Sequence, residues 1–276
     1  MLASGARLSC STSGPAGART VVLLHAWGES GRAFDRLLPL ISPEVLAVAL
    51  DQRGHGDSDK PAEGYSLEGL ARDVEALMDG LGVASAVLVG SSSGGYVAQQ
   101  VALDHPDRVD GLVLVGSPRT LQARPAFADE VEALTDPVDD AWVRRSLTWF
   151  PRFVEVPAWY VEDRVREGVR LPAHVWRTSF EGLLAARPPT EAASITTPTL
   201  VIWGDHDTLL PREEQERLAA ALPGSRLVVY EGTGHLVLWE QPERVASDLR
   251  TFLATLPPPR LRAAGRPGGT RGQPPP

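Results

Sequence analysis

Short apolar runs alternate with amphipathic stretches along most of this chain of 276 residues. The first run, Thr20–His25 (TVVLLH), has no polar break, which is typical of a strand buried on both faces of a parallel sheet. Similar runs recur at Val45–Leu50, Ala86–Val89, Leu112–Val115, Thr199–Trp203 and Arg226–Tyr230. Most of the gaps between them are long enough for a crossover helix. The pattern predicts an α/β fold with a doubly wound, mostly parallel sheet, and leaves room for one edge strand before Thr20.

Two segments show the spacing of helices that cover such a sheet. One apolar face follows Ser66, a candidate N-cap, and consists of Leu67, Leu70, Val74, Leu77, Met78 and Leu81. Near the other end of the chain, Pro242–Leu256 predicts a last helix. Proline is tolerated in the first turn of a helix, and Pro257 stops this one.

The gap between the strands that end at Val115 and begin at Thr199 is far longer than a crossover needs. It is rich in large aromatic residues, which are Trp142, Trp149, Phe150, Phe153, Trp159, Tyr160, Trp176 and Phe180. We interpret residues 118–198 as a helical cap inserted over the carboxyl edge of a core formed by residues 1–117 and 199–256. Each aromatic residue either fills the core of the cap or lines a pocket, and together they favour an apolar substrate.

Composition narrows the class of protein further. The formal net charge is −8, and residues 257–276 contain four arginines but no acidic residue, so the remainder is more acidic still. An acidic body argues against nucleic acid as a partner. Proline, glycine and arginine dominate residues 257–276, which predicts a disordered tail.

Cysteine usage and hydropathy indicate the compartment. Cys10 is the only cysteine, which excludes an intrachain disulfide. No apolar run approaches the roughly 20 residues that cross a bilayer, and residues 1–20 lack the pattern of a signal peptide. We therefore expect a cytoplasmic protein with no membrane partner.

The strongest candidate for a catalytic site is the pattern Gly-x-Ser-x-Gly. It begins at Gly90, directly after the third predicted strand, and leads into a helical pattern. Between a strand and a helix, this pattern turns the chain sharply and lifts the middle serine toward a substrate. Ser92 has a glycine at both required positions, whereas Ser93 would need Ser91 in place of the first glycine. We therefore favour Ser92 as nucleophile, with the amide of Ser93 at the helix start as a donor to an oxyanion.

A serine hydroxyl needs a base to remove its proton. Among the six histidines, His235 is favoured because its loop, flanked by Gly232 and Gly234, follows the last predicted strand. Open α/β sheets hold their chemistry at this end of their strands. His206 is the rival and is interpreted as a surface residue, while the remaining four, interpreted as structural, are His25, His55, His105 and His174.

An acid that orients the base is available in the segment Leu200–Pro211. It offers Asp205 and Asp207 just after a predicted strand. A carboxylate from either position would fix the tautomer of the imidazole and stabilise its protonated form. An aspartate beside a glycine also commonly folds a turn, as Asp205 after Gly204 would, so the residues alone leave both open.

The strand, turn and helix around Ser92, with the segments around Asp207 and His235, resemble the α/β-hydrolase family over Thr20–Leu256. The pattern is most similar to the capped branch that includes carboxylesterases, lactonases such as the 3-oxoadipate enol-lactonases, and cofactor-free perhydrolases. The resemblance implies the chain order serine, aspartate, histidine. Its Gly-x-x-Asp turn favours Asp207 over Asp205.

The resemblance extends to the loop after the first predicted strand, which reads HAWGES from His25. This loop is similar to the HG-type segment of the family, with Ala26 where glycine is usual. The resemblance implies that the backbone amide of Trp27 is the second oxyanion donor, beside that of Ser93.

These residues predict a cofactor-independent serine hydrolase that cleaves a carboxylic ester or lactone of a hydrophobic small molecule through an acyl-enzyme on Ser92. Serine at this position excludes the aspartate nucleophile of the family's haloalkane dehalogenases and epoxide hydrolases. The sequence has no cluster with metal-ligand spacing, so neither metal nor cofactor is expected. Perhydrolysis, a small-molecule receptor with a vestigial triad, and C–C bond hydrolysis stay open, as does the oligomeric state.

Overall fold

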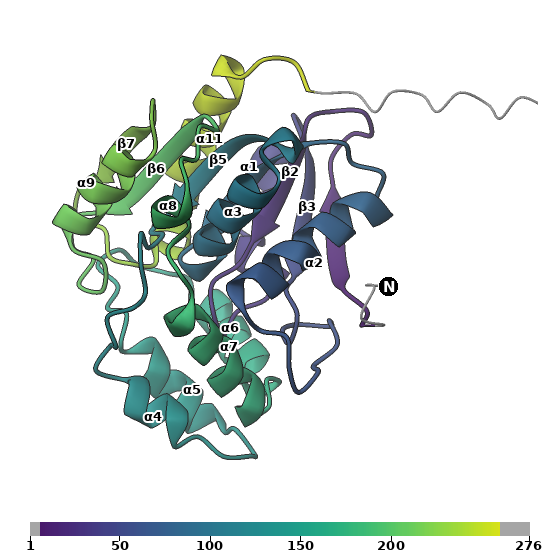
Figure 1. Cartoon of the computed structure of the whole chain (residues 1–276). Coiled ribbons are helices and arrows are strands. Elements are labelled where there is room, and N and C mark those ends of the chain that lie inside the picture. Colours follow the sequence, from purple (N-terminus) through teal and green to yellow (C-terminus); the bar gives the residue numbers. More distant parts are fainter. Residues whose placement is uncertain (1–5, 260–276) are drawn as a thin grey trace, which may run out of the picture.

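A single mixed sheet runs through the structure, a computed structural model that describes residues 6–259 (Figure 1). The strand order is β1-β3-β2-β4-β5-β6-β7, and neighbours are parallel except for β1, which pairs antiparallel with β3. The strands are β1 (Ser9–Ser13), β2 (Thr20–Leu24), β3 (Leu46–Asp51), β4 (Ala86–Ser91), β5 (Val109–Val115), β6 (Thr199–Gly204) and β7 (Arg226–Tyr230). The six predicted strands are confirmed, and β1 occupies the room predicted before Thr20.

Helices cover both faces of the sheet, which explains why its central strands are apolar without alternation. One face carries α2 (Leu67–Gly80), α3 (Ser93–Asp104) and α9 (Arg212–Ala221). The other carries the short helices η1 (Gly31–Phe34) and α1 (Leu38–Ile41), together with α10 (Val237–Glu240) and α11 (Pro242–Thr255). A further turn, η2 (Pro106–Arg108), precedes β5.

Both helices predicted from their spacing are confirmed. Ser66 caps α2, because its side chain accepts a hydrogen bond from the amide of Gly69. Helix α11 begins at Pro242 and ends one residue before the predicted boundary. No helix within residues 6–259 is long and apolar enough to span a membrane.

The long interval between β5 and β6, residues 116–198, is here called the inserted segment. It contains α4 (Ala128–Glu132), α5 (Asp140–Leu147), α6 (Ala158–Val169), α7 (Ala173–Ala185) and α8 (Pro189–Ala192). Figure 1 shows α4 to α7 gathered beyond one end of the sheet. They share a core that includes Trp142, Val165 and Trp176. These helices occupy the interval in which the sequence predicts a cap, whereas the predicted tail lies outside the described residues apart from 257–259.

The sheet order creates a crevice at the carboxyl ends of β2 and β4. After β2 the chain runs outward to β3 on one side of the sheet. It then returns to β4, on the opposite side of β2, and continues from there to β5 on the other side. The loops that follow β2 and β4 therefore leave in opposite directions, and α/β sheets bind ligands at such a point. These two loops carry Trp27 and Ser92.

Candidate active site

Ser92 sits at a strained turn between β4 and α3. Its φ of 47° and ψ of −120° make it the one non-glycine residue with a positive φ among residues 6–259. Such a conformation costs about 1–3 kcal/mol and persists only where neighbours enforce it. Here the amide of Ser92 donates to the carbonyl of Val115 and its carbonyl accepts from the amide of Gly95, each at 2.9 Å. The turn therefore holds the hydroxyl at the crevice.

The two glycines of the pattern are required by close backbone contacts. A Cβ on Gly94 would lie 2.1 Å from the carbonyl oxygen of Leu24, and one on Gly90 would lie 2.3 Å from the Cα of Gly95. Neither glycine has a positive φ. They allow α3 to start against β2 and β4, which is what makes the turn at Ser92 sharp.

The structure brings Ser92, His235 and Asp207 together. His235, which follows β7, has its Nε2 3.0 Å from Ser92 Oγ and its Nδ1 2.7 Å from Asp207 Oδ2. The imidazole and carboxylate are almost completely buried. A proton can therefore pass from the hydroxyl to an imidazole whose opposite nitrogen is already held by a carboxylate.

Asp207 is fixed by the loop that follows β6. Its Oδ1 accepts hydrogen bonds from the backbone amides of Leu209 and Leu210, each at 2.9 Å, which leaves Oδ2 for the imidazole. The rivals Asp205 and His206 are exposed, and the ring of His206 contacts Phe153 instead. Neither rival is brought to the serine.

His25 and His55 are buried and form hydrogen bonds with the backbone of the loop after β2, at Ala26 and Gly28. The amide of Gln52 donates to Nε2 of His25, so Nδ1 carries the proton and donates to the carbonyl of Ala26. Burial lowers the pKa of His25 to about 4 and that of His55 to about 3, so both rings stay neutral at pH 7. The other two histidines interpreted as structural lie at a helix end and within a helix. His105 follows α3 directly and contacts Glu75 of α2, and His174 lies in α7.

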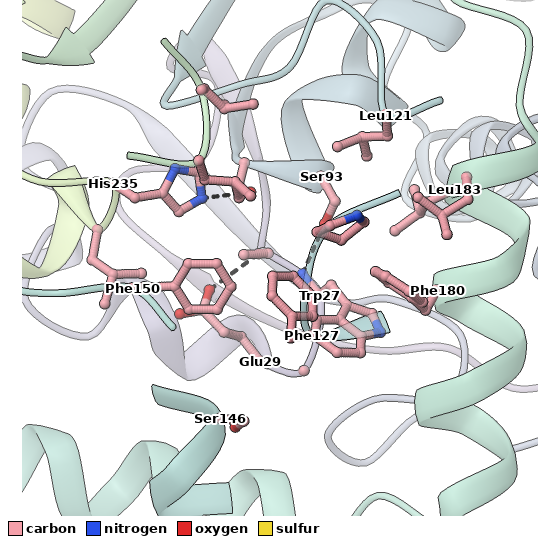
Figure 2. Close-up of a pocket in the computed structure, with 18 of the residues that line it drawn as sticks. Trp27, Glu29, Ser93, Leu121, Phe127, Ser146, Phe150, Phe180, Leu183 and His235 are labelled. Carbon is pink, nitrogen blue, oxygen red and sulfur yellow. Dashed lines mark hydrogen bonds between the residues drawn. The ribbon is translucent and has the colours of Figure 1, made fainter. Parts of the chain in front are cut away.

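The two residues predicted to supply the oxyanion donors, Trp27 and Ser93, are in contact through a hydrogen bond that the sequence did not indicate. The amide of Trp27 donates a 2.7 Å hydrogen bond to the hydroxyl of Ser93, as Figure 2 shows. Ser93 was predicted to act only through its backbone amide. Its hydroxyl also accepts the hydrogen bond of the Trp27 amide, which is the other predicted oxyanion donor. A developing oxyanion would have to share the Trp27 amide with this hydroxyl or displace it.

A substitution of Ser93 separates its two possible roles. Because Ser92 contacts the imidazole, we expect Ser93→Ala to keep any reaction that uses the serine nucleophile within about tenfold of the wild type, since one neutral hydrogen bond is worth about 1 kcal/mol. Steady-state kinetics on a short-chain nitrophenyl ester measures this. A loss of several thousandfold would make Ser93 the nucleophile instead.

A comparison with known proteins places the chain in a family. The family described as alpha/beta hydrolase fold matches residues 19–242. The chain belongs to the α/β-hydrolase family.

Other members of the α/β-hydrolase family are similar over nearly the whole chain. The esterase of Exiguobacterium antarcticum has a TM-score of 0.82 and 25% identity, covering 92% of this chain and 98% of that one. The enol-lactonase of Burkholderia xenovorans LB400 has a TM-score of 0.78 and 25% identity, covering 91% and 97%. The non-heme chloroperoxidase of Streptomyces lividans is 29% identical over 87% of this chain and 93% of its own length. One other similar structure, with a TM-score of 0.76 and 27% identity, is described as belonging to epoxide hydrolases of the alpha/beta hydrolases superfamily. Together these findings support a hydrolase of the α/β fold.

In this α/β hydrolase, Ser92 and His235 open into a cavity of about 360 Å³. Most of its lining is apolar, and Figure 2 shows aromatic side chains gathered around it. The aromatic residues of the lining are Trp27, Phe127, Phe150, Trp176, Phe180 and Trp239. The ring of Phe150 stacks on His235, with centroids 5.3 Å apart.

The eight aromatic residues predicted to fill or line the cap divide between several roles. Phe150, Trp176 and Phe180 line the cavity, while Trp142 and Trp149 pack in the core of the inserted segment. Tyr160 is buried against the sheet, and its hydroxyl donates to the carbonyl of Ala33. Phe153 and Trp159 are half-exposed. Phe127, which stacks on Trp149, was missed because it stands apart from the aromatic-rich stretch.

The buried carboxylate of Glu240 ties the histidine loop to the inserted segment. One oxygen accepts from the amide of Gly234, next to His235, at 3.1 Å. The other accepts from the amides of Phe153 and Val154 at 2.9 and 2.8 Å. No sequence pattern marks Glu240, because its partners are backbone amides of two distant segments.

Proposed function

We propose that this protein is a serine hydrolase that cleaves a carboxylic ester or lactone of a hydrophobic small molecule. The observation that carries the proposal is the continuous contact from Ser92 through His235 to Asp207, at 3.0 and 2.7 Å, beside an apolar cavity. A buried, fully partnered triad favours a working nucleophile over a vestigial one in a small-molecule receptor. The similar esterase and enol-lactonase add support for ester and lactone bonds.

The mechanism follows from the positions of these groups. Ser92 Oγ attacks the carbonyl carbon while His235 Nε2 takes its proton, and the carboxylate of Asp207 stabilises the resulting imidazolium. The amides of Trp27 and Ser93 hold the oxyanion, and one such donor is worth about 3–4 kcal/mol. His235 then protonates the leaving alkoxide. Water attacks the acyl-enzyme with His235 as base, which releases the acid and restores Ser92.

The inserted segment serves in this proposal as a cap, residues 118–198, over the core of residues 1–117 and 199–256. Its side chains from α5, α6 and α7 complete the cavity around the serine. Cavities of a few hundred cubic ångströms with few polar groups suit small, mostly apolar ligands. A lactone is opened by the same residues as an ester, because only the tether of the leaving alkoxide differs.

Formation of an acyl-enzyme on Ser92 tests the proposal. Mixed rapidly with 4-nitrophenyl butyrate, the protein is expected to release a burst of nitrophenolate near one equivalent before the steady state. Mass spectrometry after an acid quench should find the butyryl group on the peptide that contains Ser92. An undiminished rate in Ser92→Ala would overturn the assignment.

Perhydrolysis is a second candidate, favoured by the similarity to the non-heme chloroperoxidase. In that reaction hydrogen peroxide attacks the acyl-enzyme in place of water and leaves as a peracid. The ratio of peracid to carboxylic acid, measured with peroxide present, separates the two activities. A ratio well above that expected from the peroxide-to-water concentration ratio would identify perhydrolysis as the preferred reaction.

A further inference from the structure

Arg164 is a buried cation with no hydrogen-bond partner among residues 6–259. It lies on α6, lines the cavity that also contains Ser92 and His235, and is 3% exposed. None of its three guanidinium nitrogens forms a hydrogen bond within the part of the chain that the structure describes. A buried charge is normally paired, because its desolvation costs several kcal/mol. Within residues 6–259 its N–H groups are therefore unpaired and available to a ligand that enters the cavity.

The buried carboxylate of Glu29 does not pair with the guanidinium of Arg164. Glu29 interacts electrostatically with Arg164, yet the two form no ion pair within 4.0 Å. Each oxygen of Glu29 already accepts a hydrogen bond, one from Trp239 Nε1 at 2.7 Å and one from the amide of Ala26 at 3.1 Å. Burial raises the pKa of Glu29, and the charge of Arg164 opposes this rise.

The three acidic residues of α6 are paired with other arginines. Glu162 pairs with Arg144, Asp163 with Arg32 and Arg166, and Glu167 with Arg170. The guanidinium carbon of Arg164 stands 4.9 Å from the ring centroid of Tyr160. This cation–π contact covers one face of the group and leaves the N–H donors at its edge available.

A second arginine that lines the cavity, Arg119, is paired with carboxylates of the protein. Arg119 forms ion pairs with Glu191 at 2.6 Å and with Glu214 at 3.0 Å. Its guanidinium is therefore paired with two carboxylates, whereas that of Arg164 forms no hydrogen bond or ion pair with any residue from 6 to 259.

We propose that Arg164 binds a carboxylate of the substrate, so that the substrate is an anionic ester or lactone whose remaining surface is apolar. The cleavage of this substrate rests on the proposed function, whereas the binding of its carboxylate by Arg164 does not depend on it. The planar guanidinium matches a carboxylate through two parallel N–H donors. Ser92 and Arg164 line one cavity, so the reacting carbonyl and the carboxylate belong to the same small molecule. Arg164 thus determines specificity.

Matched esters that differ by one charged group test this assignment. For a carboxylate on the acyl side, mono-4-nitrophenyl glutarate is compared with 4-nitrophenyl pentanoate, in which a methyl group replaces the carboxylate. For the alcohol side, 4-carboxyphenyl butyrate is compared with phenyl butyrate. The wild type is expected to have a higher kcat/KM for the anionic ester in one of the two pairs.

Arg164→Met removes the charge and keeps most of the side-chain volume. It is expected to lower kcat/KM for the preferred anionic ester about 10²-fold and to change that for the neutral ester less than about threefold. Arg164→Lys keeps the charge without the planar fork, and its loss should be about tenfold. Arg166→Met is the matched control, because Arg166 is exposed on the same helix and does not line the cavity.

Several outcomes would overturn the inference. One is a wild type whose kcat/KM is no higher for the anionic ester in either pair. Another is an equal loss of kcat/KM for the anionic and the neutral ester in the Arg164 variants. Binding measured by calorimetry separates the inference from the proposed reaction. Ser92→Ala should bind glutarate or 4-hydroxybenzoate, and the double variant with Arg164→Met should not. Full hydrolysis by Ser92→Ala would overturn the reaction alone, while absence of binding to Ser92→Ala would overturn the carboxylate site.

Discussion

Replacing Ser92 by glycine is expected to lower kcat/KM for ester hydrolysis at least about 10⁴-fold while making the protein more stable. The activity falls because the hydroxyl 3.0 Å from His235 Nε2 is the proposed nucleophile. Stability rises because Ser92 holds a φ of 47°, which glycine adopts without steric cost. Ser92→Ala should abolish activity equally but keep the strain, so the glycine variant should exceed it by about 1 kcal/mol in free energy of unfolding.

Urea denaturation of the three proteins measures the stability difference, and nitrophenyl ester kinetics measures the activity. The hydrogen bonds of Ser92 to Val115 and Gly95 use only backbone atoms, so both substitutions are expected to keep them and the comparison of glycine with alanine isolates the Cβ. If the glycine variant were no more stable than the alanine variant, the turn would not be strained. If either variant kept appreciable activity, another residue would have to be the nucleophile.

The order of the elements was predictable from sequence because burial on both faces leaves a local signal. The continuous apolar runs at β2 to β6 are confirmed as buried strands. β7, at one edge of the sheet, is confirmed although only Tyr230 in it is buried, and β1 fills the space predicted before Thr20. β1 is an edge strand with just partly buried or exposed residues, so it lacks the apolar run that identifies the others. The individual helices of the inserted segment were not predicted, since many of their buried residues pack on one another, and only some, such as Tyr160 and Leu183, pack with the residues of the sheet.

The residues that the structure brings together at the serine were predicted because each stands in a loop with a local pattern. Ser92 lies between glycines, and Asp207 and His235 follow strands directly. The residues that surround the cavity carry no such pattern. Arg164, Glu29 and Glu240 are set by how distant segments fold against the sheet.

Replacement of Asp207 by asparagine is expected to lower kcat about 10³- to 10⁴-fold with little change in fold. The amides of Leu209 and Leu210 both donate to Oδ1, so the asparagine keeps its oxygen there and turns its NH₂ group toward His235. Nδ1 of the imidazole must then accept a hydrogen bond, and the ring proton moves to Nε2. An imidazole protonated on Nε2 donates to Ser92 Oγ and is unable to take its proton.

Asp205→Asn provides the matched control for this prediction, because Asp205 is exposed two residues away and should tolerate the change with full activity. Single-turnover kinetics isolates acylation, which is the step that requires the correct tautomer. Substrate binding does not require it, so the KM of Asp207→Asn should change far less than its kcat. Equal losses in the two variants would trace the effect to the loop after β6 instead of the proton relay. Near-normal acylation in Asp207→Asn would mean that His235 needs no carboxylate to act as the base.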